Sequence, residues 1–249
     1  MVKISAVSYL NTFPFIYGLE NSGYLQDFVI EKDIPAVCAE KLISNKVDIG
    51  LIPVAVIPQI KTAEIITDYC IGATSKVKTV LLLSKKPLNE ISKIYLDFES
   101  RTSVQLVKVL AQNYWKINPK WEKLHQNFAH TLNDDEAVVL IGDKTFNATA
   151  FYPYIYDLAS EWNDFTALPF VFACWVANKK LPNDFLTNLN NALNFGVNHI
   201  NETIAFFKES IPANADAKSY FTNNISYLLD DPKRKGMKLF FQYLKELKI

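Results

Sequence analysis

The first seventeen residues, MVKISAVSYLNTFPFIY, constrain the fold more than any other stretch of this chain. Val2 to Val7 reads as a buried strand, a polar turn follows, and Phe13 begins a helix whose first turn tolerates Pro14. Backbone N–H groups in the first turn of a helix are unpaired and favour an anion. A strand that ends in hydroxyl and amide side chains just before a helix therefore predicts a small-molecule site in an α/β fold.

The alternation of strand and helix continues along the chain and predicts a mostly parallel sheet in the first third. Further strands are predicted at residues 28–32, 46–52, 64–71, 79–84, 93–98, 136–141 and 170–178. Helices are predicted at residues 35–44 and 54–60, after a cap at Thr102 or Ser103, and from residue 183 onward. The last helix is expected to begin at the Asp230-Asp231-Pro232 segment.

Two candidate crossings between halves of the molecule are predicted near residues 84–89 and 174–178. They indicate two α/β lobes with a ligand cleft between them. The first lobe would be discontinuous and comprise residues 1–86 and 176–249, and the second would comprise residues 87–175.

Charge and hydropathy patterns exclude several classes of partner. The chain has 26 acidic and 26 basic residues and lacks a long basic run, so nucleic-acid binding is not expected. The longest apolar run, Phe170 to Ala177, is too short to cross a bilayer, and no secretory signal is expected. Three widely spaced cysteines (Cys38, Cys70 and Cys174) suit a reducing compartment, which predicts a cytoplasmic protein.

Common cofactor and metal motifs are missing from the sequence. No G-x-G-x-x-G or G-x-x-x-x-G-K-[ST] pattern occurs, so the usual dinucleotide and P-loop sites are not expected. His125 and His130 are five positions apart with no cysteine pair nearby, which argues against structural zinc. No G-x-S-x-G elbow suggests a serine hydrolase. The sequence therefore predicts neither a metal nor an organic cofactor.

Polar, mostly uncharged residues remain at predicted strand ends and helix starts. Ser8, Asn11 and Thr12 follow the first strand, and the Asn11 amide could both donate to and accept from a substrate. The alternative is that Asn11 or Thr12 merely caps the helix. Thr79, on an apolar segment, could point its hydroxyl into the cleft or serve as an ordinary β-former.

Two further groups have the same ambiguity. Ser100, Arg101, Thr102 and Ser103 combine hydroxyls, a guanidinium and a helix start, which could bind a carboxylate or phosphate or could simply cap the helix with Arg101 in solvent. The Gly142-Asp143 pair follows a strand. Gly142 would let the backbone approach a ligand, and Asp143 could bond a ligand hydroxyl or a domain hinge, or the pair could form only a turn.

These segments together resemble the MqnA family, the chorismate dehydratases of the futalosine route to menaquinone. The resemblance covers residue 2 to about residue 178. It is carried, in order along the chain, by the segments SYLNT at 8–12, DIGLIP at 48–53, SRTSV at 100–104, IGD at 141–143 and LPFVFA at 168–173.

The resemblance implies the two-lobed α/β fold of type II periplasmic binding proteins and an enzyme that acts without a cofactor. Its reaction would remove water from chorismate to give 3-[(1-carboxyvinyl)oxy]benzoate. It also implies that Asn11 and the hydroxyl of Thr79 are catalytic contacts. The family position that aligns with Thr79 holds serine, so this chain keeps the hydroxyl and adds a methyl group.

The chemistry of chorismate fits the three polar groups. It is a dianion, and helix starts after Asn11 and at Thr102-Ser103 could each hold a carboxylate, with Arg101 as a counter-charge. Either Asp143 or the substrate's own side-chain carboxylate could take the proton. We favour the substrate carboxylate because the motifs are rich in neutral donors and poor in bases.

Three other functions fit parts of the pattern. A non-catalytic binding protein for a small carboxylate would share the fold, but no signal peptide is expected. The sister enzyme that acts on a cyclic futalosine carries Ser-Pro-Cys-Pro-Asn-Asp in its N-terminal turn, where this chain has SYLNT. A ligand-sensing domain of a regulator would need a DNA-binding segment, and none is expected before Met1. The oligomeric state stays open.

Overall fold

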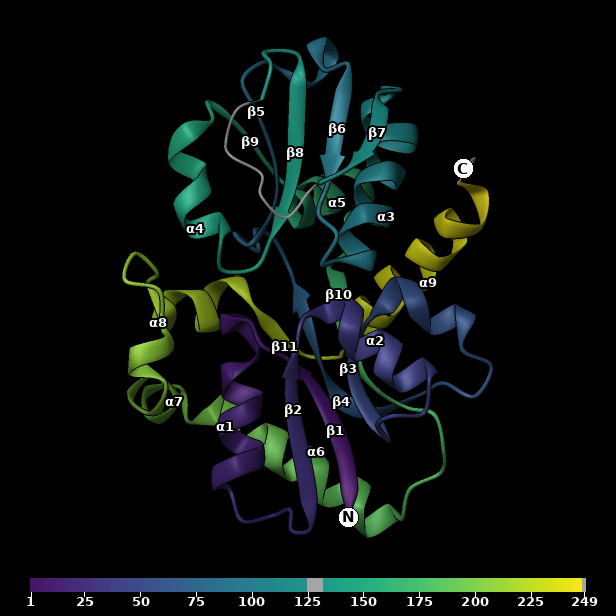
Figure 1. Cartoon of the computed structure of the whole chain (residues 1–249). Helices are drawn as coiled ribbons and strands as arrows, with labels where there is room; N and C mark the ends of the chain where they lie inside the picture. The colour runs from purple at the N-terminus through teal and green to yellow at the C-terminus, as the bar shows by residue number, and fades with distance from the viewer. Residues whose placement is uncertain (125–131, 248–249) are drawn as a thin grey trace.

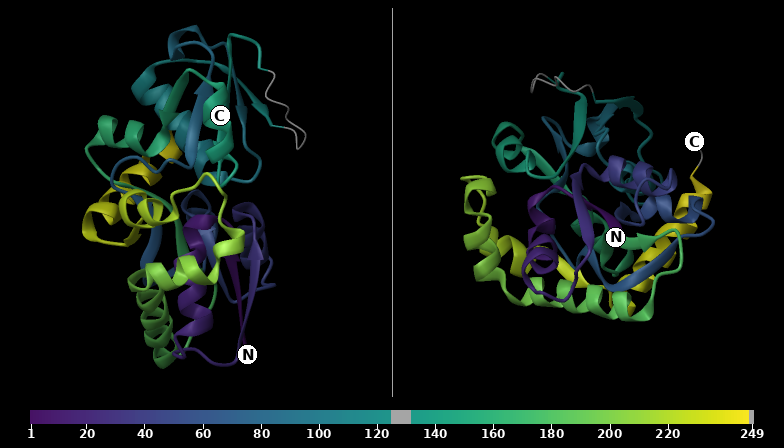
Figure 2. Two further views of the ribbon diagram at one scale, coloured as in Figure 1. Left: turned by 90° about the vertical axis from the view of Figure 1, so that its left-hand side faces the viewer. Right: turned by 60° about the horizontal axis from the view of Figure 1, so that its bottom comes forward.

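The computed structural model describes residues 1–124 and 132–247, so His125 and His130 lie outside the described residues. The chain forms two β-sheets with helices packed around each (Figure 1). We call the six-stranded sheet and its helices the first lobe, and the five-stranded sheet and its helices the second lobe. The two lobes are stacked, with the C-terminal helix beside their junction (Figure 2).

The sheet of the first lobe has the order β11-β4-β10-β3-β1-β2. Its strands are β1 (Val2–Val7), β2 (Phe28–Asp33), β3 (Ile49–Pro53), β4 (Glu64–Ala73), β10 (Phe170–Ala177) and β11 (Ser226–Leu228). Strand β1 pairs in parallel with β2 and with β3, whereas β10 pairs antiparallel with both β3 and β4. The sheet is therefore mixed, and the parallel arrangement predicted for the first third of the chain is confirmed in β1, β2 and β3.

The sheet of the second lobe has the order β7-β6-β8-β5-β9. Its strands are β5 (Val80–Ser84), β6 (Lys93–Leu96), β7 (Lys120–Lys123), β8 (Glu136–Ile141) and β9 (Tyr154–Asp157). All six residues of β8 are buried, and they pair with β5 on one side and with β6 on the other. A continuous apolar run flanked on both sides is typical of a strand inside a covered sheet.

Helices of the first lobe are α1 (Phe13–Asn21), α2 (Pro35–Ile43), α6 (Asn183–Asn198), α7 (Ile200–Phe206), α8 (Ala217–Ser219) and α9 (Asp231–Glu246). Those of the second lobe are α3 (Arg101–Leu110), α4 (Thr145–Ala148) and α5 (Leu158–Thr166). Helices α1 and α6 pack so closely that a Cβ atom at Gly196 would lie 1.8 Å from the Pro14 carbonyl oxygen. Only glycine allows that approach. The close packing against α6 holds α1 in place after the turn that joins it to β1.

The chain passes from the first sheet to the second at residues 74–79, between β4 and β5, and returns at residues 158–169, between β9 and β10. The crossings predicted near residues 84–89 and 174–178 are therefore wrong in position. Strand β5 already belongs to the second sheet, and the whole of β10 lies in the centre of the first. A lobe boundary at residues 74–79 and 158–169 replaces the division at residues 86 and 175.

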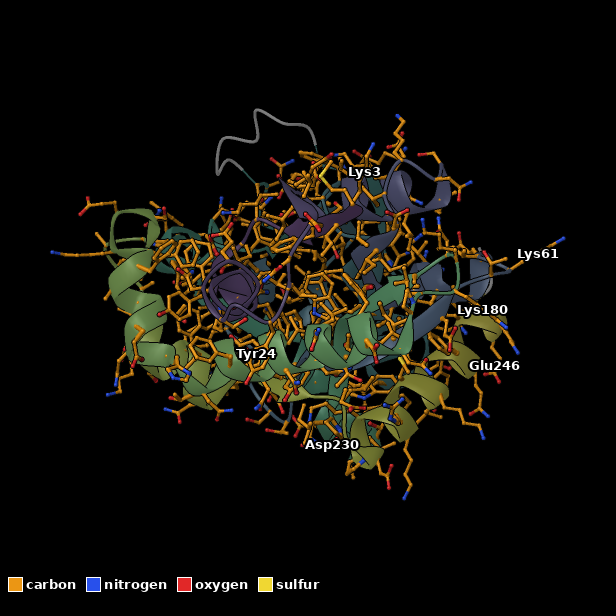
Figure 3. The ribbon with its side chains drawn as sticks, turned by 90° about the horizontal axis from the view of Figure 1, so that it is seen from below. Lys3, Tyr24, Lys61, Lys180, Asp230 and Glu246 are labelled. Carbon is orange, nitrogen blue, oxygen red and sulfur yellow. The ribbon has the colours of Figure 1, made fainter. Side chains whose placement is uncertain are left out.

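The charged side chains of Lys61, Lys180 and Glu246, labelled in the view from below, lie on the outside of the molecule (Figure 3). The three cysteines are buried free thiols in the core of the first lobe. Within residues 1–124 and 132–247, no helix is long and apolar enough to cross a membrane.

Candidate active site

A cavity of about 50 Å³ lies between the lobes, and its walls come from both sheets. Val7, Pro53 and Phe172 contribute from the first lobe, and Val80 and Ile141 from the second. The predicted site residues that line it are Asn11, Thr79, Ser100, Thr102, Ser103 and Gly142. These predicted residues come from four separate segments of the sequence and meet at one place.

Asn11 lies in a short 3-10 helix, η1 (Leu10–Thr12), that joins β1 to α1. Its side-chain oxygen Oδ1 accepts a hydrogen bond of 3.0 Å from the Thr12 hydroxyl, and its backbone carbonyl accepts one of 3.1 Å from the Tyr227 hydroxyl. Because Oδ1 faces Thr12, the amide nitrogen Nδ2 is directed away from it. Thr12 is fully buried behind Asn11 and does not line the cavity, so it orients Asn11 rather than facing a ligand.

Thr79 ends the crossing that leads into β5, and its side chain is 1 % exposed. Its hydroxyl oxygen lies 2.6 Å from the hydroxyl of Tyr220, which belongs to a π-helical turn, η7 (Tyr220–Asn224). Burial raises the pKa of the Tyr220 phenol well above its ordinary value, so this hydroxyl stays protonated. Thr79 is therefore held by a neutral partner from the C-terminal part of the chain.

The N-terminus of α3 faces the cavity. Ser100 is the N-cap, and its hydroxyl accepts a 2.9 Å bond from the Ser103 backbone N–H, so the predicted cap at Thr102 or Ser103 is wrong. Ser100 takes the cap because its backbone is extended, whereas the next residues are already helical. The Thr102 hydroxyl donates to the Phe172 carbonyl at 3.0 Å and accepts from the Ala55 N–H at 3.3 Å, which ties α3 to the first lobe.

Gly142 has a φ of +70°, and a Cβ atom there would lie 2.9 Å from the ring of Tyr9. Glycine is required both by this left-handed conformation and by the approach of the ring. The next residue, Asp143, does not line the cavity. Its two carboxylate oxygens accept from the Leu10 N–H at 3.1 and 3.2 Å, and burial raises the pKa of the carboxyl to about 6.

Tyr9 completes a second contact between the lobes. Its hydroxyl donates to Glu99 Oε2 at 2.6 Å, and Lys144 Nζ lies 2.8 Å from the same oxygen and 2.7 Å from Asp97 Oδ2. Asp97 is fully buried, and its other oxygen accepts from the Glu99 N–H. Tyr9 therefore forms one wall of the cavity and links β1 to the ends of β6 and β8.

Two predicted site residues are placed elsewhere. Ser8 is exposed, and its backbone N–H bonds the Asp33 carbonyl. Arg101 is exposed and faces an outer groove together with Gln59 and Lys108, because consecutive helical residues point about 100° apart and Thr102 and Ser103 take the inward directions. The expected counter-charge at Arg101 is therefore absent from the cavity.

Among the described residues that line the cavity, none is lysine, arginine or histidine. The described part of the chain also contains no group of three or more His, Cys, Asp or Glu side chains arranged to hold a metal ion. The arrangement offers hydroxyl, amide and helix N–H donors in an apolar enclosure. Such a site can bind and orient a small anion and can stabilise charge that develops during a reaction.

Sequence reasoning missed Tyr9 and Tyr220 as individual site residues. Tyr9 stands between predicted site residues, but an aromatic ring in a turn gave no chemical signal of its own. Tyr220 lies 141 positions from Thr79 and follows Ala217, Lys218 and Ser219, which form no recognisable motif. Only the tertiary structure brings this hydroxyl to Thr79.

Comparison with known proteins agrees with this architecture. The chain is 25% identical over 256 residues to a chorismate dehydratase of Thermus thermophilus, a match that covers 95% of this chain and 92% of that protein. The solved structure of protein AF1704 from Archaeoglobus fulgidus superposes with a TM-score of 0.75 at 13% identity and covers 98% of this chain and 97% of that one.

The Candida albicans CA3427 gene product, described as having the generic periplasmic binding protein fold, superposes with a TM-score of 0.60 at 14% identity and covers 100% of this chain and 91% of that one. The predicted two-lobed periplasmic-binding-protein-like fold is confirmed. A family model described as menaquinone biosynthesis matches residues 2–246. The chain therefore belongs to this menaquinone biosynthesis family.

Proposed function

We propose that this protein removes water from chorismate to give 3-[(1-carboxyvinyl)oxy]benzoate in menaquinone biosynthesis. The family match over residues 2–246 and the Thermus thermophilus chorismate dehydratase support this function. The observation that carries the proposal at the site is the meeting of Asn11 and Thr79 across one apolar cavity beside the N-terminus of α3.

The two carboxylates of chorismate can be placed against the donors of the cavity. The N-terminus of α3, with Ser100, Thr102 and Ser103, supplies backbone N–H groups and hydroxyls that favour one carboxylate. The Asn11 amide, which has Oδ1 turned to Thr12, presents its nitrogen as a donor toward the second carboxylate. The apolar walls at Val80, Ile141 and Phe172 pack against the ring.

In the proposed reaction, the side-chain carboxylate of chorismate takes the proton from ring carbon C3. The C3–H electron pair forms the new ring double bond as the C4–O bond breaks, and the departing hydroxide leaves as water when it takes the proton now held by the side-chain carboxyl group. The ring becomes aromatic, so the driving force lies in the substrate. The protein contributes orientation, exclusion of water and hydrogen bonds from Asn11 and Thr79.

The position of Asp143 supports this choice of base. A general base must reach the proton that it removes, directly or through one water. Both oxygens of Asp143 accept from the Leu10 N–H, and the carboxylate does not line the cavity. Asp143 therefore serves in this proposal to join the lobes.

Binding requires the lobes to move apart. A free volume of about 50 Å³ holds a few water molecules and is far below the roughly 300 Å³ or more of ordinary ligand pockets. The direct contacts from Tyr9 to Glu99 and from Leu10 to Asp143 join the two lobes next to the cavity. We propose that they break on substrate entry and that the lobes then close on the bound substrate, which excludes water.

We also propose a cytoplasmic location. Cys70 and Cys174 are direct neighbours on the antiparallel strands β4 and β10, yet both are free thiols. Burial raises the pKa of Cys70 to about 12, so neither packing nor charge favours a thiolate there. Adjacent free thiols of this kind suit a reducing compartment.

The decisive experiment is to incubate the purified protein with chorismate, without added cofactor, and to follow the products by chromatography and mass spectrometry. The expected product is the enolpyruvyl benzoate, lighter than chorismate by one water, and Asn11→Ala is expected to abolish its formation. The matched variant Asn198→Ala, at an exposed position on α6, controls for the loss of an asparagine. Chorismate left intact beyond spontaneous decay, with the protein folded, would instead favour a binding protein or the sister enzyme acting on a cyclic futalosine.

A further inference from the structure

The hydroxyl of Tyr220 contacts both of the residues to which the proposed function assigns the reaction. It lies 2.6 Å from the Thr79 hydroxyl oxygen, and it also interacts with the side chain of Asn11. Tyr220 is 2 % exposed, and its ring meets Phe146 edge-on with centroids 5.6 Å apart. One buried phenol therefore joins the donor of the first lobe to the donor of the second.

The directions of the hydrogen bonds follow from the partners of each group. Thr12 donates to Asn11 Oδ1, so Asn11 can offer only Nδ2 to Tyr220, and the phenol oxygen accepts. Because Tyr220 is a buried, protonated phenol, its own proton is free to be donated to Thr79. The other acceptor near Thr79, the Val77 carbonyl, is 3.5 Å away, too far to hold the Thr79 proton well.

We propose that Tyr220 is a positioning residue: it donates to Thr79 and accepts from Asn11, so that the Thr79 proton and the second Nδ2 hydrogen of Asn11 both face the substrate. The inference rests on the proposed function. Under it, the Thr79 hydroxyl supplies a hydrogen bond to the departing C4 oxygen. Tyr220 strengthens that donor through the chain of hydrogen bonds without touching the substrate.

The segment that carries Tyr220 is anchored to the crossing between the lobes. Asn224, at the end of η7, donates to the Lys76 carbonyl at 2.9 Å, and Lys76 lies within residues 74–79. Tyr227, in β11, donates to the Asn11 carbonyl at 3.1 Å. The C-terminal segment thus holds Tyr220 at a fixed place relative to both Thr79 and Asn11.

The test is Tyr220→Phe, which removes one oxygen and keeps the ring. We expect kcat for chorismate dehydration to fall about 10- to 100-fold with KM changed less than about threefold, because misplaced donors chiefly affect the transition state. Thr79→Val is expected to lower kcat as well. Since Tyr220 acts through Thr79, adding Tyr220→Phe to Thr79→Val should lower kcat by less than about threefold more.

The matched control is Tyr69→Phe, which removes a hydroxyl that donates to Asn194 on α6, because neither residue lines the cavity. It should leave kcat and KM as in the wild type. If Tyr220→Phe does not fold, Phe146→Leu is the second variant, because it loosens the Tyr220 ring and keeps the hydroxyl. It should lower kcat when residue 79 is threonine and not when it is valine.

Two results would overturn the inference. One is a wild-type kcat in folded Tyr220→Phe, and the other is a double variant whose fold loss in kcat equals the product of the losses of Tyr220→Phe and Thr79→Val. For Phe146→Leu, an equal fold loss in kcat with threonine and with valine at residue 79 would overturn the inference as well. Failure of the proposed function is distinguishable, because the wild-type protein itself would then leave chorismate intact.

Discussion

Replacing Asp143 by asparagine distinguishes two roles for this carboxylate, a general base in the reaction and a hydrogen-bond acceptor that joins the lobes. The substitution keeps a carbonyl oxygen that can accept from the Leu10 N–H, and it removes the charge and the basicity. If the substrate carboxylate is the base, kcat at pH 8 should stay within about fivefold of the wild-type value. If Asp143 were the general base, kcat should fall about 10²- to 10⁴-fold while chorismate still binds.

The same variant has a predicted effect on stability. Burial raises the pKa of Asp143 from 3.8 to about 6, even though the Leu10 N–H lowers it. Such a shift corresponds to about 3 kcal/mol between the two protonation states, and partial solvation reduces this to about 1–3 kcal/mol. The protonated carboxyl stabilises the folded state below pH 4, and this contribution is lost as the pH rises through 6.

Asp143→Asn should therefore unfold at a higher urea concentration than the wild type at pH 8, and the gap should close near pH 4. Unfolding can be followed by the fluorescence of the four tryptophans. Asp164→Asn, at an exposed carboxylate on α5, should change stability by less than about 0.5 kcal/mol at either pH. A variant less stable than the wild type at pH 8 would refute the reasoning about burial, and a kcat loss beyond about 100-fold with intact binding would refute the assignment of the base.

Three further outcomes are expected. Thr79→Ser should keep kcat within about threefold of the wild-type value because it retains the hydroxyl. Thr79→Val, which lacks the hydroxyl, should lower kcat about tenfold or more in the product assay. Gly142→Ala should lower the free energy of unfolding by about 2–4 kcal/mol, because it adds a left-handed strain and a contact with the Tyr9 ring; an unchanged melting temperature would contradict this. Small-angle scattering curves should differ with and without bound substrate or product, and identical curves would exclude a hinge motion at residues 74–79 and 158–169.

The parts of the fold that depend on neighbouring residues could be predicted from the sequence. The strand at Val2–Val7, the turn and the helix from Phe13 form as expected because apolar runs, a proline in the first helical turn and polar turn residues act over a few positions. Asp230 caps the last helix for the same local reason.

The crossings between lobes could not be predicted in this way. The Lys85-Lys86-Pro87 segment has the composition of a linker, but the strand before it is already paired with β8 and β9 in the second sheet. Strand β10 pairs with β3 and β4, whose residues lie about a hundred or more positions earlier. Sheet membership is decided by such distant pairing, which leaves no trace in local composition.

In the candidate site, too, residues whose role depends on local sequence could be predicted, and those that depend on distant contacts could not. Asn11, Ser100 and Gly142 could be found because a strand end or a helix start requires an amide, a hydroxyl or a glycine at that position. Tyr220 could not, since its role depends on a partner 141 positions away. Arg101 was misplaced for a geometric reason: the direction of a side chain at a helix start depends on how the helix is rotated against the rest of the fold.

The exclusion of Arg101 makes sense if the substrate supplies its own base. A carboxylate paired with a guanidinium has its pKa lowered by about 1–3 units and gives up lone pairs to hydrogen bonds, so it becomes a weaker base. Hydroxyls, amides and helix N–H groups also lower the pKa of a carboxylate, but they orient it without placing a full positive charge beside it. Among the described residues, the cavity offers only such neutral donors. A base supplied by the substrate, as proposed, agrees with a cavity that lacks this cation, since the rotation of α3 places Arg101 in the outer groove.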